Sequence, residues 1–318
     1  MKTALIIALI CLTVGAILVG TGWVLLQKNP TDMNTIKDVS KVYHISEAPT
    51  QISITTTESR IEVRPIEGDE WRVECKDKEK VYHTIDLTDG VLTIKQIDKR
   101  VWYEHIGILS GFQNLSVIVY LPLQEYENLS IRSTSGSIKV EEGLTFSNAE
   151  LQNTSGSITC ASSVAGSLAA TNTSGSITVK GSVGGDLNVK NTSGSITVSG
   201  GVNGKLDVVN ASGRIEIKAA TPTSVIIKNT SGGIDLYDVV CKETCEITNT
   251  SGSIKFERCD ALAFDLQTTS GSIRGSILTA KTFDCKSTSG GVHTPYDGNG
   301  GTFKARSTSG GINITVVE

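Results

Sequence analysis

Residues 191–199 read NTSGSITVS, and nearly the same nine letters begin at Asn153, Asn172 and Asn249. A fixed internal period is the signature of a repeat architecture, so this spacing bears directly on the fold. The central glycine of the motif recurs at intervals of 19 or 20 residues, at Gly136, Gly156, Gly175, Gly194, Gly213, Gly232, Gly252, Gly271, Gly290 and Gly310. The sequence therefore predicts a repeat domain from residue 127 to residue 318.

Each repeat places apolar residues at alternating positions on both sides of its glycine. Ile or Val stands two residues after the glycine in every copy, and apolar residues stand five and seven before it. This period of two predicts two short strands joined through a corner. One unit cannot close a core, whereas stacking at about 4.8 Å turns each inward position into a continuous ladder. We therefore expect an all-β fold, a β-solenoid resembling a parallel β-helix, with about ten coils. A propeller is excluded because its blades need about 40–45 residues.

The TSG corner itself has a predicted geometry. Glycine tolerates a positive φ, so the recurrent glycine indicates an αL-type bend. The position three residues earlier should point inward, where stacked side-chain amides would hydrogen-bond along the axis. N-glycosylation also fits the N-x-S/T pattern, but a role in the turn accounts for all the copies. Asparagine fills this position at Asn153, Asn172, Asn191, Asn210, Asn229 and Asn249, and Ser133, Thr268, Ser287 and Ser307 fill the other coils.

The amino-terminal part of the chain differs from the repeats. Residues 3–26 carry no charge and are long enough to cross a bilayer of about 30 Å. We expect residues 1–26 to form a transmembrane anchor, with a cleaved signal sequence as the alternative. Residues 27–45 are predicted to be a stalk, and residues 46–126 an amino-terminal β region that forms early coils or a cap. The predicted localisation is the cell membrane, single-pass, with the bulk of the chain extracytoplasmic.

Charge and cysteine usage limit the classes of partner and cofactor. The net charge of −4 gives no basic footprint for nucleic acid. Cys160, Cys245 and Cys285 fall at inward positions and are expected to pack as small apolar side chains. A Cys241–Cys259 disulfide remains an open alternative, and Cys75 has no evident partner. No cofactor and no metal site is predicted.

Candidate functional residues lie on the outward face and in one insertion. Asp265 and Asp284 occupy the same outward site in repeats that follow one another, so they are expected to be neighbours in a stripe of carboxylates. Such a pair is a candidate for glycoside hydrolysis, although a solvated face is favoured. The aromatic segment WYEHIGILSGF, with Trp102, Tyr103 and Phe112, is either a cap over the first coil or a partner-binding loop. The four histidines are scattered and predict no catalytic site.

The carboxyl end raises a separate expectation about the edge of the sheet. The sequence GGINITVVE ends on the last predicted strand, with no capping helix after it. That strand is expected to be the open edge of the solenoid, blunted or used for a partner. The oligomeric state is left open.

The YLP preceding ENLSIRSTSGSIKV and the repeated L-x-V-x-N-T-S-G-S-I-T-V unit resemble the bacterial putative-adhesin family of β-strand-repeat domains. With its anchor and stalk, the chain is similar to the LiaG-type members, which are encoded with a cell-envelope stress response in Gram-positive bacteria. The resemblance covers about residues 46–318 and implies a surface-exposed β-solenoid with a role in adhesion or envelope stress. It supplies no catalytic residues.

These observations together predict a membrane-anchored, non-enzymatic binding or scaffolding module at the cell envelope. Its expected partners are the membrane, through the amino-terminal helix, and a cell-wall glycan or an envelope protein. The alternatives are a polysaccharide-acting β-helix enzyme and a purely structural surface spacer.

Overall fold

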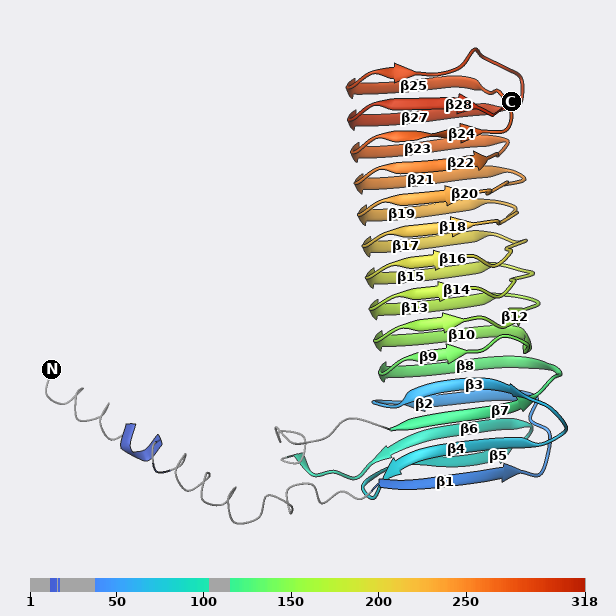
Figure 1. Cartoon of the computed structure of the whole chain (residues 1–318), viewed down its shortest axis with the longest axis vertical. Coiled ribbons are helices and arrows are strands. Elements are labelled where there is room, and N and C mark those ends of the chain that lie inside the picture. The colour runs from blue at the N-terminus through green and yellow to red at the C-terminus, as the bar shows by residue number, and fades with distance from the viewer. Residues whose placement is uncertain (1–11, 16, 18–37, 103–114, 318) are drawn as a thin grey trace, which may run out of the picture.

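The computed structural model describes residues 12–15, 17, 38–102 and 115–317. In this part of the chain 28 strands hydrogen-bond into one continuous sheet system. The repeats form a straight rod of stacked coils, and the amino-terminal strands form its broader base (Figure 1). The predicted all-β solenoid is confirmed.

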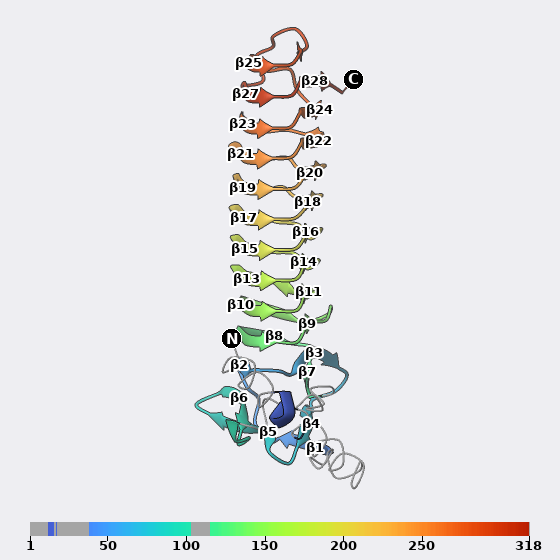
Figure 2. The same cartoon turned by 90° about the vertical axis from the view of Figure 1, so that its left-hand side faces the viewer.

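Two parallel rows of strands run the length of the rod and appear as separate columns in Figure 2. In the first row, nine parallel pairings join ten strands, which gives about nine turns of solenoid. Each strand of this row ends at the serine of a TSG corner. The strands are β8 (Glu125–Ser135), β10 (Thr145–Ser155), β13 (Leu168–Ser174), β15 (Leu187–Ser193), β17 (Leu206–Ser212), β19 (Val225–Ser231), β21 (Thr244–Ser251), β23 (Ala263–Ser270), β25 (Thr282–Ser289) and β27 (Thr302–Ser309).

The second row begins just after each corner and consists of shorter strands. A third side is closed by β12 (Ser163–Val164) and by isolated bridges that join Val164, Val183 and Val202. The second row comprises β9 (Ile138–Val140), β11 (Ile158–Cys160), β14 (Ile177–Val179), β16 (Ile196–Val198), β18 (Ile215–Lys218), β20 (Ile234–Tyr237), β22 (Ile254–Cys259), β24 (Ile273–Ile277), β26 (Val292–His293) and β28 (Ile312–Val316).

The core is a set of aliphatic ladders along the rod axis. In the middle coils Leu187, Val189, Ile196 and Val198 are fully buried, and the equivalent residues of the coils above and below are paired with them in register. Burial of this kind is the dominant favourable contribution to folding. The inward positions predicted from the alternation are therefore the core of the solenoid.

The base of the rod continues the solenoid and then turns antiparallel. β2 (Gln51–Thr56) and β3 (Arg60–Ile66) pair in parallel beneath β8 and β9. Below them lie β6 (Val91–Asp98) and β7 (Ser116–Pro122), to which β5 (Val81–Thr88) and β4 (Trp71–Lys78) pair antiparallel. β1 (Asp38–Ile45) pairs with β4 and closes the sheet. Residues 38–45, which the sequence assigns to the stalk, are therefore part of this base.

The predicted membrane anchor lies largely outside the described residues, as does most of the stalk. Within the ranges that the structure describes, no helix has the length and apolar character needed to cross a membrane.

The last two repeats are stacked in the reverse of their sequence order. β27 and β28 pair with β23 and β24 on one side and with β25 and β26 on the other, so the final repeat is inserted beneath the penultimate one. The expectation that the carboxyl-terminal strand forms the open edge is therefore wrong. The edge is β25 and β26, at the top of Figure 1.

Side-chain composition explains this exchange. The final repeat offers Ile312 and Ile314 to the core, and both are buried between neighbouring coils. The penultimate repeat offers Val292 and then Thr294, and Val292 stays 39% exposed. Placing the more apolar repeat inside buries more aliphatic surface.

A buried lysine holds the segment that skips over the inserted coil. Lys281 is 2% exposed, and its Nζ lies 2.6 Å from Asp260 Oδ1. The same ammonium donates to Gly300 O at 2.6 Å and to Thr279 Oγ1 at 2.6 Å. It thus joins the outgoing segment to the returning one, and no feature of the repeat pattern predicts it.

Each corner glycine is required for two reasons, of which the sequence indicates one. All ten have a positive φ, between 108° and 158°, which is more extended than the predicted αL bend. A Cβ on Gly194 would also lie 2.3 Å from the carbonyl oxygen of Gly175 in the coil below. The corners stack too closely for any side chain at this position.

The inward asparagines bind the glycine carbonyls rather than one another. Asn191 is 6% exposed, and its Nδ2 donates to Gly175 O at 2.9 Å; the other five asparagines make the equivalent bond at 2.7 to 3.1 Å. Hydroxyls substitute for the amide in other coils, as at Thr268, whose Oγ1 donates to Gly252 O at 3.1 Å. The predicted inward orientation is confirmed, but the amide-to-amide ladder is wrong, because the Oδ1 atoms of all six asparagines accept no hydrogen bond.

Candidate functional site

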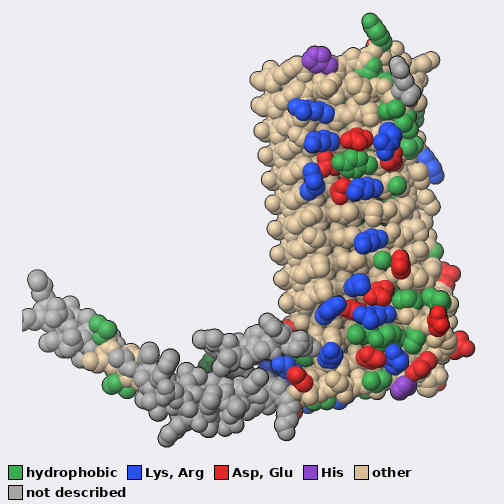
Figure 3. All heavy atoms as spheres, viewed as in Figure 1, with side chains coloured by type: hydrophobic (Ala, Val, Ile, Leu, Met, Phe, Trp, Pro, Cys, Tyr) green, Lys and Arg blue, Asp and Glu red, His purple; other side chains and the backbone are tan. Residues whose placement is uncertain are grey.

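The exposed side of the TSG corner carries two rows of hydroxyl groups. The two residues that precede each glycine are exposed in every coil, because the chain bends there and both side chains leave the core. The nearer position is serine in all ten coils, and the other is threonine in nine, with Ala211 as the exception. This edge of the rod, at the left of Figure 3, shows no charged side chain over most of its length.

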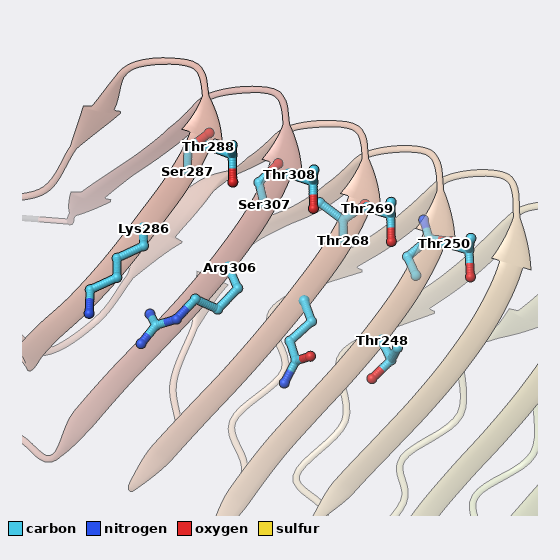
Figure 4. A pocket seen from close by; sticks show the side chains of 12 residues that line it. Thr248, Thr250, Thr268, Thr269, Lys286, Ser287, Thr288, Arg306, Ser307 and Thr308 are labelled. Atoms are coloured by element: carbon cyan, nitrogen blue, oxygen red, sulfur yellow. The ribbon is translucent and has the colours of Figure 1, made fainter.

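A shallow groove lies beside these rows near the carboxyl-terminal end of the rod. Its volume is about 390 Å³, and its side chains come from four neighbouring strands, β21, β23, β27 and β25 (Figure 4). Hydroxyls and amides form most of its surface, and two cations lie at one end. Its residues are Thr248, Asn249, Thr250, Gln267, Thr268, Thr269, Lys286, Ser287, Thr288, Arg306, Ser307 and Thr308.

The order of the coils determines the charge along this groove. Lys304 lies in register between Asp265 and Asp284. The expectation that the two carboxylates lie in neighbouring coils is therefore wrong. Lys304 Nζ lies 2.9 Å from Asp265 Oδ2, and the Arg306 guanidinium contacts the Asp284 carboxylate. A glycosidase needs two carboxyl groups facing one bond. Asp265 and Asp284 are instead compensated by cations, which removes the main support for the hydrolase alternative.

The pKa values of both carboxyls reflect these cations. Burial raises the pKa of Asp265, but hydrogen bonds from Lys304 and Gln267 outweigh it, and the resulting pKa is below the ordinary value. For Asp284, the hydrogen bond from Arg306 is the largest influence and lowers the pKa. Both groups are therefore anions at neutral pH and act as partners of the cations rather than as general acids.

Two other predicted surfaces can be placed only in part. Trp102, at the start of the aromatic segment, is 75% exposed. Tyr103 and Phe112 lie outside the described residues. Asp235, which alternates with the inward Ile234 and Leu236 along β20, is nevertheless 3% exposed, and Arg214 Nε lies 2.8 Å from its carboxylate.

Several cysteines come together inside the upper coils. Cys241, Cys245 and Cys259 are all buried free thiols, so the alternative of a Cys241–Cys259 disulfide is not found. A hydrogen bond with Cys241 and burial raise the pKa of Cys245 well above its ordinary value. Cys160 is likewise buried as predicted, whereas Cys285 is only half-buried, because it lies on the edge strand β25.

A buried polar cluster in the base was not predicted. Asp77 on β4 and His83 on β5 lie close together, with His83 Nδ1 2.6 Å from Asp77 Oδ1. The other ring nitrogen, Nε2, lies 2.9 Å from Ser59 Oγ, which lies 3.1 Å from Gln96 Oε1. All except Gln96 are at most 2% exposed. Single residues spread from position 59 to position 96 carry no spacing signal, so only the fold reveals the cluster.

The arrangement has the order Ser–His–Asp, but its hydrogen bonds are directed the wrong way for a nucleophile. The backbone N–H groups of Thr57 and Glu58 donate to Gln96 Oε1 at 2.9 and 3.1 Å, which identifies that atom as the amide oxygen. Ser59 Oγ must then donate to Gln96, so it accepts a proton from His83 Nε2. In a catalytic triad the histidine takes the proton from serine. With Ser59 fully buried, this cluster does not support acyl transfer.

A comparison with family models identifies the family of the chain. The model of the family described as Toastrack DUF4097 matches residues 49–237 and 204–318, which together span most of the chain. The chain belongs to the Toastrack DUF4097 family. A search of curated proteins finds no match.

Solved structures similar to this Toastrack chain include three from Bacteroides and Parabacteroides species. A "putative adhesin" from Bacteroides fragilis is 14% identical, with 88% of this chain and 97% of that chain covered and a TM-score of 0.39. A "putative adhesin" from Parabacteroides merdae is 15% identical, with 90% and 98% covered and a TM-score of 0.37. A "putative lipid binding protein" from Parabacteroides distasonis is 14% identical, with 88% and 97% covered and a TM-score of 0.41.

Proposed function

We propose that this protein is a membrane-anchored, non-enzymatic binding module that presents a rigid β-solenoid to polar polymers of the cell envelope, chiefly cell-wall glycans. The groove lined by hydroxyls and amides beside the TSG corner is the observation that carries the proposal. Glycan chains offer hydroxyls at a regular repeat and bind to surfaces that donate and accept hydrogen bonds. Repeated weak contacts along a rod add up through multivalency.

The charges at the groove suit such a ligand. Lys286 and Arg306 both contact the carboxylate of Asp284. Two cations therefore share one anion, and this end of the groove carries a net positive charge. An acidic substituent on the polymer would gain a charge-assisted hydrogen bond there. The rest of the groove is uncharged and would accept the neutral hydroxyl groups.

Two further parts of the proposal depend on the sequence. The uncharged residues 3–26 support anchoring in a membrane. Resistance of the full chain in a bacterial membrane fraction to alkaline extraction tests this, and release by alkali would contradict it. The resemblance to LiaG-type proteins supports a link to envelope stress, which transcript measurements after cell-wall antibiotics test.

Binding is tested with the full-length chain in detergent, on a glycan array and by co-sedimentation with peptidoglycan. Replacing Thr250, Thr269 and Thr308 together by valine removes three groove hydroxyls at nearly constant volume. We expect at least tenfold weaker binding. The matched control replaces Thr159, Thr178 and Thr197, on the second row of strands, by valine, and should bind like the unchanged chain. Absence of any ligand, or equal loss in both variants, would refute the proposal.

A further inference from the structure

The three potential metal ligands in the base come from one hairpin whose strands diverge. Cys75 and Asp77 alternate along β4, which pairs with β1 and β7, whereas His83 lies on β5, which pairs with β6. β4 and β5 are in register only at Lys78 and Val81, next to the turn. Beyond that point the strands separate, and their inward side chains face one another across the space between.

These side chains bring a thiol, a carboxylate and an imidazole to one buried point. The Cys75 Sγ, a carboxylate oxygen of Asp77 and a ring nitrogen of His83 all lie within 4.8 Å of one another. The three residues are 1%, 2% and 1% exposed. Ligand atoms around a tetrahedral zinc lie about 3–4 Å apart, given bonds of about 2.0–2.3 Å. Small side-chain rotations would bring the three atoms onto such a sphere.

The hydrogen bonds of His83 orient it as a metal-bound histidine is oriented. Its Nε2 proton is donated to Ser59 Oγ, and the chain of donors ends on Gln96, which two backbone amides fix in place. Nδ1 is directed at Asp77 Oδ1, 2.6 Å away, across a shared proton whose place a metal ion would take. Histidines that bind metals usually donate their other N–H to a protein acceptor in this way, which fixes the tautomer and the ring orientation.

The Cys75 thiol is the group that the hydrogen-bond network leaves without a role. It is a buried free thiol with no hydrogen-bond partner among the described residues, and so it is available as a ligand. Burial first, and then the nearby Asp77 charge, raises the pKa of this thiol to about 12. A divalent cation would reverse this effect, because a coordinating thiol is deprotonated. Thiolate, carboxylate and neutral imidazole together balance the charge of a divalent ion.

We propose that Cys75 Sγ, Asp77 Oδ1 and His83 Nδ1 bind one zinc ion in the base of the solenoid. Zinc fits this mixed set of sulfur, nitrogen and oxygen ligands, with the fourth position left to a water molecule. Binding releases the thiol proton of Cys75 and the proton that His83 and Asp77 otherwise share. The ion ties β4 to β5 where the hairpin divides, and so joins the two halves of the base on which the rod stands.

The test uses the full-length chain without a polyhistidine tag. Purified protein is loaded with zinc, dialysed, and analysed for metal by mass spectrometry. We expect one zinc per chain, and Co²⁺ in its place should give the near-ultraviolet absorption of a thiolate–cobalt bond. Cys75→Ala should lose both signals. The matched control is Cys160→Ala, which removes another fully buried thiol from the second row of strands and should keep both.

A second variant keeps the proposal testable if Cys75→Ala does not fold. Ser59→Ala leaves all three ligands in place but removes the acceptor of the His83 Nε2 proton, so zinc affinity should fall by about 10–100-fold. Zinc binding should also raise the melting temperature of the unchanged chain. A folded, unchanged chain that retains no zinc would overturn the proposal. So would a Cys75→Ala variant that binds zinc as Cys160→Ala does.

Discussion

The close stacking of the corners predicts a large effect from a single methyl group at Gly194. In Gly194→Ala the new Cβ would lie 2.3 Å from Gly175 O and 2.7 Å from Gly175 C. A carbon and a carbonyl oxygen need more than 3 Å, so the corner of the lower coil would have to move by almost 1 Å. Gly175 O also accepts the hydrogen bond from Asn191 Nδ2, and Gly194 N–H donates to Ser212 O. Both bonds would lengthen.

The magnitude is the sum of three terms: the cost of the positive φ, the weakened hydrogen bonds and the entropy of the unfolded chain. Holding alanine at a φ of 123° costs about 1–3 kcal/mol. Weakening two hydrogen bonds adds about 0.5–1.5 kcal/mol each. Restricting the unfolded chain returns about 0.4–1 kcal/mol. We therefore expect Gly194→Ala to lower the free energy of unfolding by about 2–5 kcal/mol.

Gly201 provides the matched control within the same part of the rod. A Cβ there would meet nothing within 4 Å, and its φ lies outside the positive region. Gly201→Ala should therefore change stability by less than about 1 kcal/mol. Urea unfolding of both variants gives the global effect. Because neighbouring coils contribute separately in repeat proteins, hydrogen exchange at the Ile196 amide, which bonds Arg214 O, gives the local effect. Equal stability of the two variants would refute the account of the corner.

Three further predictions test the corner, the coil order and the charges. Asn191→Ala should lower the free energy of unfolding in urea by about 1–3 kcal/mol, because Gly175 O loses its hydrogen-bond donor. Asn191→Ser keeps a donor and should lower it by less. Equal losses of stability in the two variants would contradict this account of the corner. A double variant with cysteines at positions 265 and 304, which lie in neighbouring coils, should form a disulfide on oxidation, detected on non-reducing gels. A double variant with cysteines at positions 265 and 284 should not, because these positions lie in alternate coils about 9.6 Å apart. The opposite result would show that the coils stack in sequence order. Lys304→Met should raise the pKa of Asp265 in an NMR titration. Because the pKa of Asp265 is lowered in the folded chain, the ionised Asp265 stabilises the fold at pH values above the unfolded pKa of about 3.9. This stabilisation is lost as the pH falls through the folded pKa. An unchanged Asp265 pKa in Lys304→Met would show that Lys304 is not the cause of the lowered pKa.

The candidate binding surface could be predicted in kind but not in detail. Exposure of the threonine and serine before each glycine follows from the bend, and the sequence shows both residues directly. The groove depends on which four strands are neighbours, and the repeat pattern does not show that β27 lies between β23 and β25. The same exchange separates Asp265 from Asp284. A short repeat allows either order, and the choice depends on how much aliphatic surface each coil can bury.

The sequence by itself determined the solenoid, its period, its inward ladders and the positions of its corners, because those features depend on local alternation and on a glycine every 19 or 20 residues. Only the tertiary structure decided the contacts between coils and the order in which the last coils stack along the axis. It showed that Asn191 binds a glycine carbonyl of the coil below and that the last repeat lies beneath the penultimate one. It also gathered Cys75, Asp77 and His83 into one buried cluster. The physical reason is that these contacts join residues of different coils or diverging strands, whose registers are set by packing of the whole core rather than by any local pattern.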